Sequence, residues 1–195
     1  MIRRPTLRTF VTTIAIASAT ALTACATGPV PSDRSGMSPD VAIEEFFEGR
    51  TYAYGVFERG EVLDRRIYVE LDGDWDAATR TLTLDEHFLY DDGRTQQRTW
   101  TMRQTAEGRF IATAPDVVGE AELIEFGDAA FYSYLVDLPL EDGSTVQVRF
   151  NDRLYRVGND VMINRAEVTK FGITFGEVAF VFLKDRPSDW PEIPR

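Results

Sequence analysis

Residues 81–102, TLTLDEHFLYDDGRTQQRTWTM, contain the pattern that decides the fold. In the first half, apolar side chains occupy every second position, and the polar side chains between them share the opposite face. The turn signal Asp91-Asp92-Gly93 follows, and a second alternating run begins beyond it. Such alternation is typical of half-buried strands, so the stretch predicts a β-hairpin. The apolar face of its first strand carries Leu82, Leu84, Glu86, Phe88 and Tyr90.

The same pattern continues on both sides of this hairpin. Short turn signals rich in Gly and Asp separate the runs, and no helix-length amphipathic segment lies between them. Successive strands without crossover helices predict an all-β fold, an antiparallel up-and-down barrel of the calycin or lipocalin kind, although a sandwich also fits the pattern. The predicted strands cover residues 51–58, 62–72, 79–90, 96–104, 108–114, 117–126, 129–138, 144–156, 160–170 and 174–184.

A short N-terminal helix precedes the predicted strands. Ser38-Pro39 supplies a good N-cap and a good first helical residue, and Ile43, Phe46 and Phe47 share one apolar face. Such a helix could plug one end of a barrel. We therefore expect a barrel domain over residues 38–186 and a proline-containing C-terminal extension over 187–195, with Trp190 packed against the barrel.

The first residues predict the cellular location. Residues 1–24 combine three arginines with a short apolar stretch, too short to span a bilayer and typical of a signal peptide. The stretch ends in Leu22-Thr23-Ala24-Cys25, the pattern of a bacterial lipoprotein box, so we expect Cys25 to carry a lipid anchor with fatty acids such as palmitate. Residues 25–37 then form a lipidated tether. Because Ala26 is not the aspartate of inner-membrane lipoproteins, we expect the periplasmic face of the outer membrane.

Composition excludes several kinds of partner. The chain has 21 Lys and Arg against 32 Asp and Glu, a net charge of −11, so it would repel nucleic acid. One cysteine and one histidine leave no cysteine-cluster or histidine-rich metal site and no credible catalytic triad. We therefore expect no metal and no cofactor, and the sequence favours a non-enzymatic role.

Two groups of residues could line the interior and bind a ligand. With the expected turn, Glu86 pairs with Trp100, and Arg98 lies diagonally beside Glu86 on the inner face. Such a pair could bind a ligand head group, or it could be a structural ion pair that sets the strand register. Arg165 shares a strand face with Val161 and Ile163 and could reach a carboxylate ligand, or it could pair with an acid on the outer face.

The chain also resembles an uncharacterised bacterial lipoprotein family, domain of unknown function number 3833. The resemblance rests on Phe46-Phe47-Glu48-Gly49, residues 82–86 and 90–93, 98–100 and 116–121, Leu138-Pro139, and residues 163–166, 170–172 and 176–178. One departure is Asn151-Asp152-Arg153-Leu154, where the family pattern expects Asp-Asp-Trp-Met. The resemblance implies a lipid-anchored, calycin-like periplasmic barrel and gene neighbours in membrane fatty-acid modification, but no established activity.

Three functions fit these observations. The first is an outer-membrane-anchored barrel that binds or presents a fatty acid or lipid, as an accessory to membrane lipid modification or envelope maintenance. The second is an enzyme that acts on a lipid-like substrate inside the barrel, with Glu86 and Arg98 at its polar centre. The third is an interaction module for another envelope protein, with a filled barrel. A wide interior would favour the first two, and a solid core would favour the third.

Overall fold

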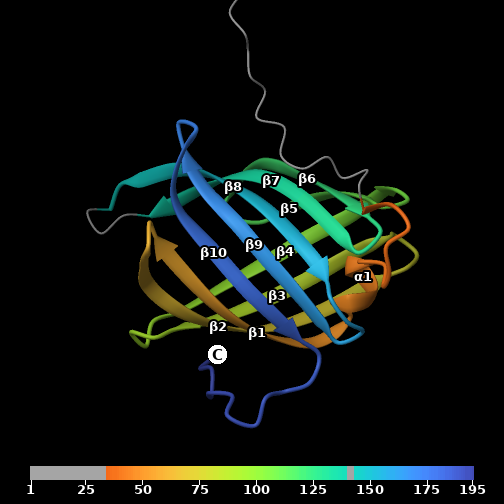
Figure 1. Ribbon diagram of the computed structural model, residues 1–195, viewed down its shortest axis with the longest axis horizontal. Coiled ribbons are helices and arrows are strands. Elements are labelled where there is room, and N and C mark those ends of the chain that lie inside the picture. Colours follow the sequence, from red (N-terminus) through yellow and green to blue (C-terminus); the bar gives the residue numbers. More distant parts are fainter. Residues whose placement is uncertain (1–33, 140–142) are drawn as a thin grey trace, which may run out of the picture.

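The computed structural model describes residues 34–139 and 143–195, which form a closed antiparallel barrel (Figure 1). Each strand pairs with its sequence neighbours, and β1 pairs with β10 to close the barrel, so the alternative of a sandwich is wrong. All ten predicted strands are present. Their bounds are β1 Gly49–Arg59, β2 Val62–Asp76, β3 Thr81–Tyr90, β4 Thr95–Ala106, β5 Arg109–Thr113, β6 Val117–Phe126, β7 Ala129–Pro139, β8 Thr145–Arg156, β9 Val161–Lys170 and β10 Ile173–Leu183.

The alternating pattern predicts the inner face of the first hairpin correctly. On β3, Leu82, Leu84 and Phe88 are buried, and Glu86 is only 9% exposed. On β4, Trp100 and Met102 are buried as well. Because a strand turns successive side chains to opposite faces, local sequence is enough to decide which residues enter the core.

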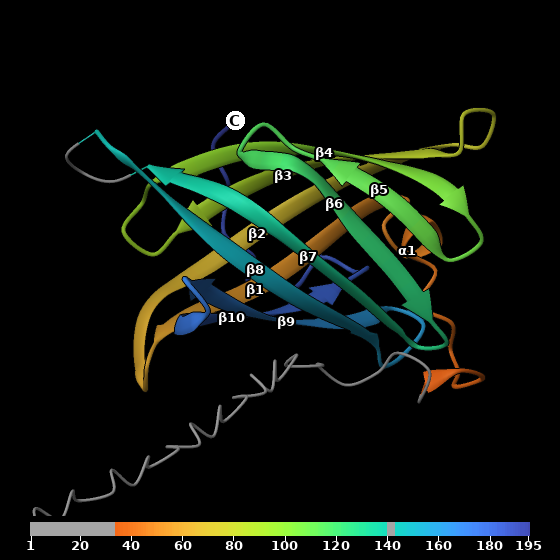
Figure 2. The same cartoon turned by 90° about the horizontal axis from the view of Figure 1, so that it is seen from above.

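One end of the barrel is closed by α1 (Ile43–Phe46), which both views show at the same end (Figures 1 and 2). Ile43, Phe46 and Phe47 are buried in the core, as predicted. The predicted start at Ser38-Pro39 is wrong, because the helix is one turn long and begins after Ala42, which makes no side-chain cap. The later start of the helix follows from a tertiary contact. The residues before the helix bond to the barrel instead, and the Val41 N–H donates to the Gly127 carbonyl at 2.7 Å.

Charged side chains hold this closed end in place. Lys184 donates to the carbonyl oxygens of Phe46 (2.9 Å) and Glu48 (2.7 Å). Carbonyl groups at the end of a helix have no partner within it, and Lys184 supplies one. The Ile43 N–H donates to Glu125 at 2.9 Å. Burial raises the pKa of Glu125 to about 7, since its environment disfavours the charged form.

The C-terminal segment leaves β10 and passes back below β1 and β2 (Figure 1). Trp190 is buried there, 7% exposed, with its ring edge-on to Tyr52, Tyr54 and Tyr68 at 5.0–5.8 Å. Trp190 therefore packs against the outer wall of the barrel. Among the described residues, no helix has the length and hydropathy needed to cross a membrane.

Candidate functional site

The predicted Glu86–Arg98 pair is present inside the barrel. Arg98 Nε donates to Glu86 Oε2 at 2.7 Å, and the exposed fractions of the two side chains are 20% and 11%. The predicted register is wrong by two residues: Glu86 lies directly opposite Arg98, and Trp100 lies opposite Leu84. A shift of two leaves every side chain on its face, so the pair forms although the predicted register was different.

Arg98 also contacts groups beyond Glu86. Its Nη1 lies 3.5 Å from Asp116 Oδ2, in the connection before β6. Its guanidinium carbon lies 5.5 Å from the ring centre of Phe88 and 5.2 Å from that of Trp100, within the range of cation–π contacts. Burial lowers the pKa of Arg98, but Glu86, Tyr134 and Asp116 together outweigh this effect and raise the pKa overall, so Arg98 is a permanent cation.

Trp100 connects Arg98 to the opposite wall of the barrel. Its ring is edge-on to Tyr134 at 5.2 Å and to Tyr132 at 6.4 Å, both on β7. Tyr132 stacks on Tyr134 at 5.2 Å, and Tyr134 stacks on Phe150 of β8 at 5.6 Å. Three stacked rings thus line the inner face of β7 and β8.

A second buried carboxylate lies beside these rings. Asp152 of β8 pairs in register with Tyr132 and is 6% exposed. Its Oδ1 accepts a hydrogen bond from the side-chain amide of Asn164 at 2.7 Å. Its Oδ2 is shielded from solvent and has no hydrogen-bonding partner at normal distance among the described residues, and the same holds for Asp116 Oδ1.

Burial controls the protonation of this cluster. It raises the pKa of Asp152 to about 7, and Asn164, Tyr134 and Arg98 oppose the rise without cancelling it. Burial also raises the pKa of Glu86, although Arg98 lowers it in part. Asp152 can therefore hold or release a proton near neutral pH, and the pKa of Glu86 lies above its usual range. We call Glu86, Arg98, Asp116, Tyr132, Tyr134, Asp152 and Asn164 the interior cluster.

The interior around the cluster is almost filled. A cavity lined by Glu86, Trp100, Tyr132 and neighbouring apolar side chains has a volume of about 30 Å³. That is room for one water molecule, whereas ligand pockets usually have volumes of several hundred Å³. Aromatic side chains fill the centre of the barrel, so a whole acyl chain does not fit there.

More space lies at the open end of the barrel, opposite α1. A groove of about 290 Å³ is formed there by Val146, Val148, Lys170, Phe171, Ile173 and Phe175. Phe171, at the tip of the β9–β10 hairpin, is 94% exposed, and Ile173 is 72% exposed. The neighbouring β1–β2 hairpin exposes Val62 (68%) and Leu63 (46%). Exposed apolar residues gathered in one place are typical of a contact site. We call this groove the mouth groove.

The remaining predicted residues lie elsewhere. Arg165 points outward, its side chain is 64% exposed, and it pairs with Glu177 of β10 at 2.8 Å. Of the two predicted roles for Arg165, the structure therefore shows the ion pair with an acid on the outer face. The structure therefore does not bring Arg165 together with Glu86, Arg98 and Trp100. Cys25 lies outside the described residues.

Sequence reasoning did not identify the β7–β9 side of the interior cluster. Asp152 follows Val146, Val148 and Phe150 on the apolar face of its strand, just as Glu86 follows Leu82 and Leu84. A carboxylate on an otherwise apolar face is the signal that identified Glu86, and the same signal could have identified Asp152.

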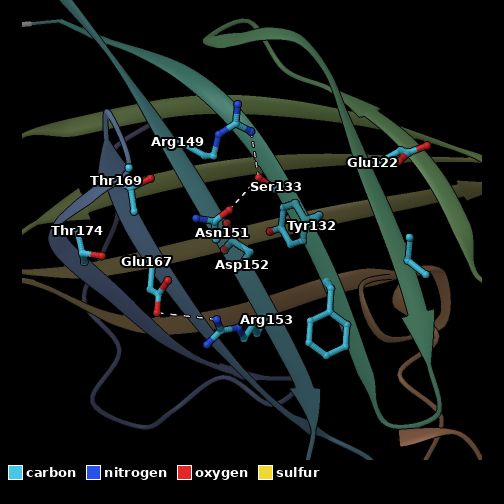
Figure 3. A pocket seen from close by; sticks show the side chains of 13 residues that line it. Glu122, Tyr132, Ser133, Arg149, Asn151, Asp152, Arg153, Glu167, Thr169 and Thr174 are labelled. Atoms are coloured by element: carbon cyan, nitrogen blue, oxygen red, sulfur yellow. Dashed lines mark hydrogen bonds and ion pairs between the residues drawn. The ribbon is translucent and has the colours of Figure 1, made fainter. Parts of the chain in front are cut away.

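A larger groove of about 780 Å³ lies on the outer surface over β6–β10 (Figure 3). Its polar side chains contact one another: Arg149 donates to Ser133 at 3.1 Å, Ser133 donates to Asn151 at 2.9 Å, and Arg153 lies 3.8 Å from Glu167. Figure 3 also shows Asp152 beside Tyr132. No group of three metal-binding side chains was found in residues 34–139 and 143–195.

Comparison with protein-family models identifies the family. The model described as "Protein of unknown function (DUF3833)" matches residues 19–184. The chain belongs to this family. A search of the curated proteins returned no match for this DUF3833 member.

Two solved structures share the fold of this DUF3833 protein. One is an S-type phycobiliprotein lyase, CPES, from Guillardia theta, with a TM-score of 0.54 and 10% identity over 75% of this chain and 94% of the lyase. The other is a protein of unknown function from the DUF3598 family of Nostoc punctiforme, with a TM-score of 0.51 and 14% identity over 81% of this chain and 52% of that protein. At these identities the likeness shows the fold, a lipocalin-like barrel.

Proposed function

We propose that this protein is a lipoprotein anchored to the periplasmic face of the bacterial outer membrane, whose barrel binds or presents a fatty acid or lipid. The pattern at Leu22-Thr23-Ala24-Cys25 supports the anchor. In this role the protein would assist membrane lipid modification or envelope maintenance.

The mouth groove is the observation that carries the binding proposal. Its lining is apolar except for Lys170, and two of its lining residues, Phe171 and Ile173, are 94% and 72% exposed. An exposed phenylalanine at a hairpin tip gains free energy when an apolar molecule covers it. The groove of about 290 Å³ has room for part of an acyl chain, whereas the interior cavity of about 30 Å³ does not.

The filled interior supports a second candidate function. A barrel with so little internal space fits an interaction module for another envelope protein, which would cover the same exposed side chains at the open end. The two functions differ in what covers Phe171: an apolar small molecule in the first case, and a protein surface in the second.

Native mass spectrometry of the protein purified from bacterial membranes tests the first function. We expect lipid adducts on the wild-type chain, and their loss when Phe171→Asp and Ile173→Asp place charges in the groove. Val157→Asp is the matched control, since Val157 is 56% exposed between β8 and β9, at the end that holds α1. Adducts that are absent from the wild-type chain, or equal in all three proteins, would contradict lipid binding at the mouth groove.

A fractionation experiment tests the anchor. Cys25→Ser should release the protein from the outer-membrane fraction once the signal peptide has been made cleavable, because no apolar helix of the described residues replaces the lipid. If the variant still sediments with outer membrane after a salt wash, the lipid is not what holds the protein there.

A further inference from the structure

The interior cluster contains more negative groups than it can neutralise. Glu86, Asp116 and Asp152 contribute three carboxyl groups, and Arg98 is the one basic side chain that contacts any of them among the described residues. Arg98 bonds to Glu86 at 2.7 Å and reaches Asp116 at 3.5 Å. Asp152 accepts a hydrogen bond from the neutral amide of Asn164, and Tyr134 and the more distant charge of Arg98 also favour its ionised form, but burial outweighs them and raises its pKa.

Two carboxylate oxygens of the cluster lack a hydrogen-bond donor. Asp152 Oδ2 and Asp116 Oδ1 are buried and have no hydrogen-bonding partner in the described part of the chain. Folded proteins rarely leave such acceptors unpaired, because removal from water is compensated only when a donor is gained. Asp152 is 6% exposed, so bulk water is not that donor. The arrangement lacks one donor beside Asp152.

The inner face of β8 connects the mouth groove with Asp152. Its inward residues run in the order Val146, Val148, Phe150, Asp152, and the first two line the groove. At roughly 3.3 Å per residue, Val148 and Asp152 lie about 13 Å apart along the strand. Phe150 lies between them, half-buried and stacked on Tyr134. Phe150 is therefore the inward side chain of β8 that separates the mouth groove from Asp152.

From these observations we infer that the molecule bound at the mouth is an amphiphile with an amino head group, whose ammonium N–H donors pair with Asp152 Oδ2. This inference rests on the proposed lipid-binding function and names the chemistry of its head group. A single positive charge would balance the Asp152 carboxylate and supply the missing donor. A free fatty acid would instead add a fourth carboxylate to a site whose one guanidinium is already paired with Glu86.

The test compares three single-chain amphiphiles of equal length. The full wild-type chain, held in lipid nanodiscs, is equilibrated with equal concentrations of dodecylamine, dodecanol and dodecanoate, and the adducts are counted by native mass spectrometry. We expect at least a tenfold excess of dodecylamine over each of the other two. Equal binding of dodecanol would overturn the requirement for charge, and equal or better binding of dodecanoate would overturn the inference as a whole.

Two isosteric variants locate the effect. Asp152→Asn removes the buried charge, and an asparagine oxygen can still accept the hydrogen bond from Asn164, so the preference for the amine should fall to near one. Asp85→Asn makes the same change on the exposed outer face of β3 and should leave the tenfold preference intact. An unchanged preference in Asp152→Asn would overturn the assignment to Asp152, and thermal melts confirm that both variants are folded.

Failure of the proposed function gives a different result. If none of the three amphiphiles binds the wild-type chain above the level of the Phe171→Asp, Ile173→Asp variant, the mouth groove is not a lipid site. If all three bind through the groove without preference, lipid binding stands and the inference about the head group is wrong.

Discussion

Two groups of carboxylates lie on opposite sides of the same barrel wall and differ in how well they are satisfied. On the outer face of β2, Glu70 and Asp72 flank Leu71, which pairs across the sheet with Glu86 of the interior cluster. The outer acids face two guanidinium groups, those of Arg50 and Arg195. The inner cluster has three acids and one guanidinium group.

Each carboxylate oxygen of the outer pair has a partner. Glu70 Oε1 accepts from Trp190 Nε1 at 3.1 Å, and Glu70 Oε2 accepts from Arg50 Nη1 at 3.1 Å. Asp72 accepts from Arg50 on one oxygen and from Arg195 at 3.4 Å on the other. We call Arg50, Glu70, Asp72, Trp190 and Arg195 the outer cluster. Its balance of charge and bonds is what a structural ion-pair network needs.

The difference separates a structural role from a functional one. The outer cluster fastens the C-terminal segment to the barrel and leaves no acceptor open. The interior cluster keeps a carboxylate in an environment that disfavours its charge, with an open acceptor oxygen. Proteins retain such unfavourable arrangements mainly where binding or proton transfer uses them. The interior cluster is therefore the better candidate site.

Removing the one cation of the interior cluster should have the largest effect. Arg98→Met would leave Glu86, Asp116 and Asp152 without a counter-charge, so we expect the free energy of unfolding at pH 8 to fall by about 3–5 kcal/mol. Urea denaturation followed by circular dichroism measures this change. At pH 5 the loss should be smaller, because protonation removes the charges that are left unpaired. An equal loss at both pH values would show that Arg98 acts through packing alone.

Removing the unpaired interior charge should stabilise the protein. Burial raises the pKa of Asp152 from 3.8 to about 7, so the folded state keeps a proton that the unfolded state has released between these pH values. Stability therefore falls as the pH rises through this range and is level above it. Asp152→Asn should raise the unfolding free energy at pH 8 by at most about 4 kcal/mol.

The control for this prediction is the pH profile of each protein. Asp152→Asn should show a flatter decline in stability between pH 4 and pH 7 than the wild type, with a remaining slope from Glu125, whose pKa is also raised to about 7. If Asp152→Asn instead destabilised the protein at pH 8, the conclusion that the buried charge of Asp152 lowers the stability of the folded state would be contradicted.

The matched change in the outer cluster should be milder. Arg50 is 38% exposed, and Arg195 and Trp190 still contact the same acids when it is removed. We expect Arg50→Met to lower the unfolding free energy by about 1 kcal/mol, a typical value for an ion pair near the surface. Thermal melts at low and high salt check this, since screening should reduce the difference. A loss as large as that of Arg98→Met would erase the contrast between the clusters.

The smallest effect should come from the outer face of the first hairpin. Asp85 is exposed and accepts a hydrogen bond from the Thr99 hydroxyl. Asp85→Asn should change stability by less than about 0.5 kcal/mol, because surface substitutions away from buried features are usually nearly neutral. Denaturation curves at pH 8 compare it with Asp152→Asn. A change of several kcal/mol would mean that burial does not separate the two aspartates.

Local sequence determined the strands and their faces. The alternation in residues 81–102 places Glu86 with Leu82 and Leu84 whatever the partner strand does, because the geometry of a strand turns successive side chains to opposite sides. The same reasoning places Trp100 inside and finds the buried apolar face of the closing helix. These features depend only on neighbours in sequence, so they could be predicted without the fold.

Tertiary structure alone decided the register, the helix start and the composition of the candidate site. The register between β3 and β4 differs by two residues from the predicted one, since a two-residue shift preserves the faces and the pattern does not distinguish the alternatives. The interior cluster draws on residues from Glu86 to Asn164, which meet only because β1 pairs with β10 and closes the barrel. Whether a buried carboxylate has a hydrogen-bonding partner depends on side chains from strands far apart in the sequence. The pattern of residues within one strand does not predict which of those side chains lie close to it.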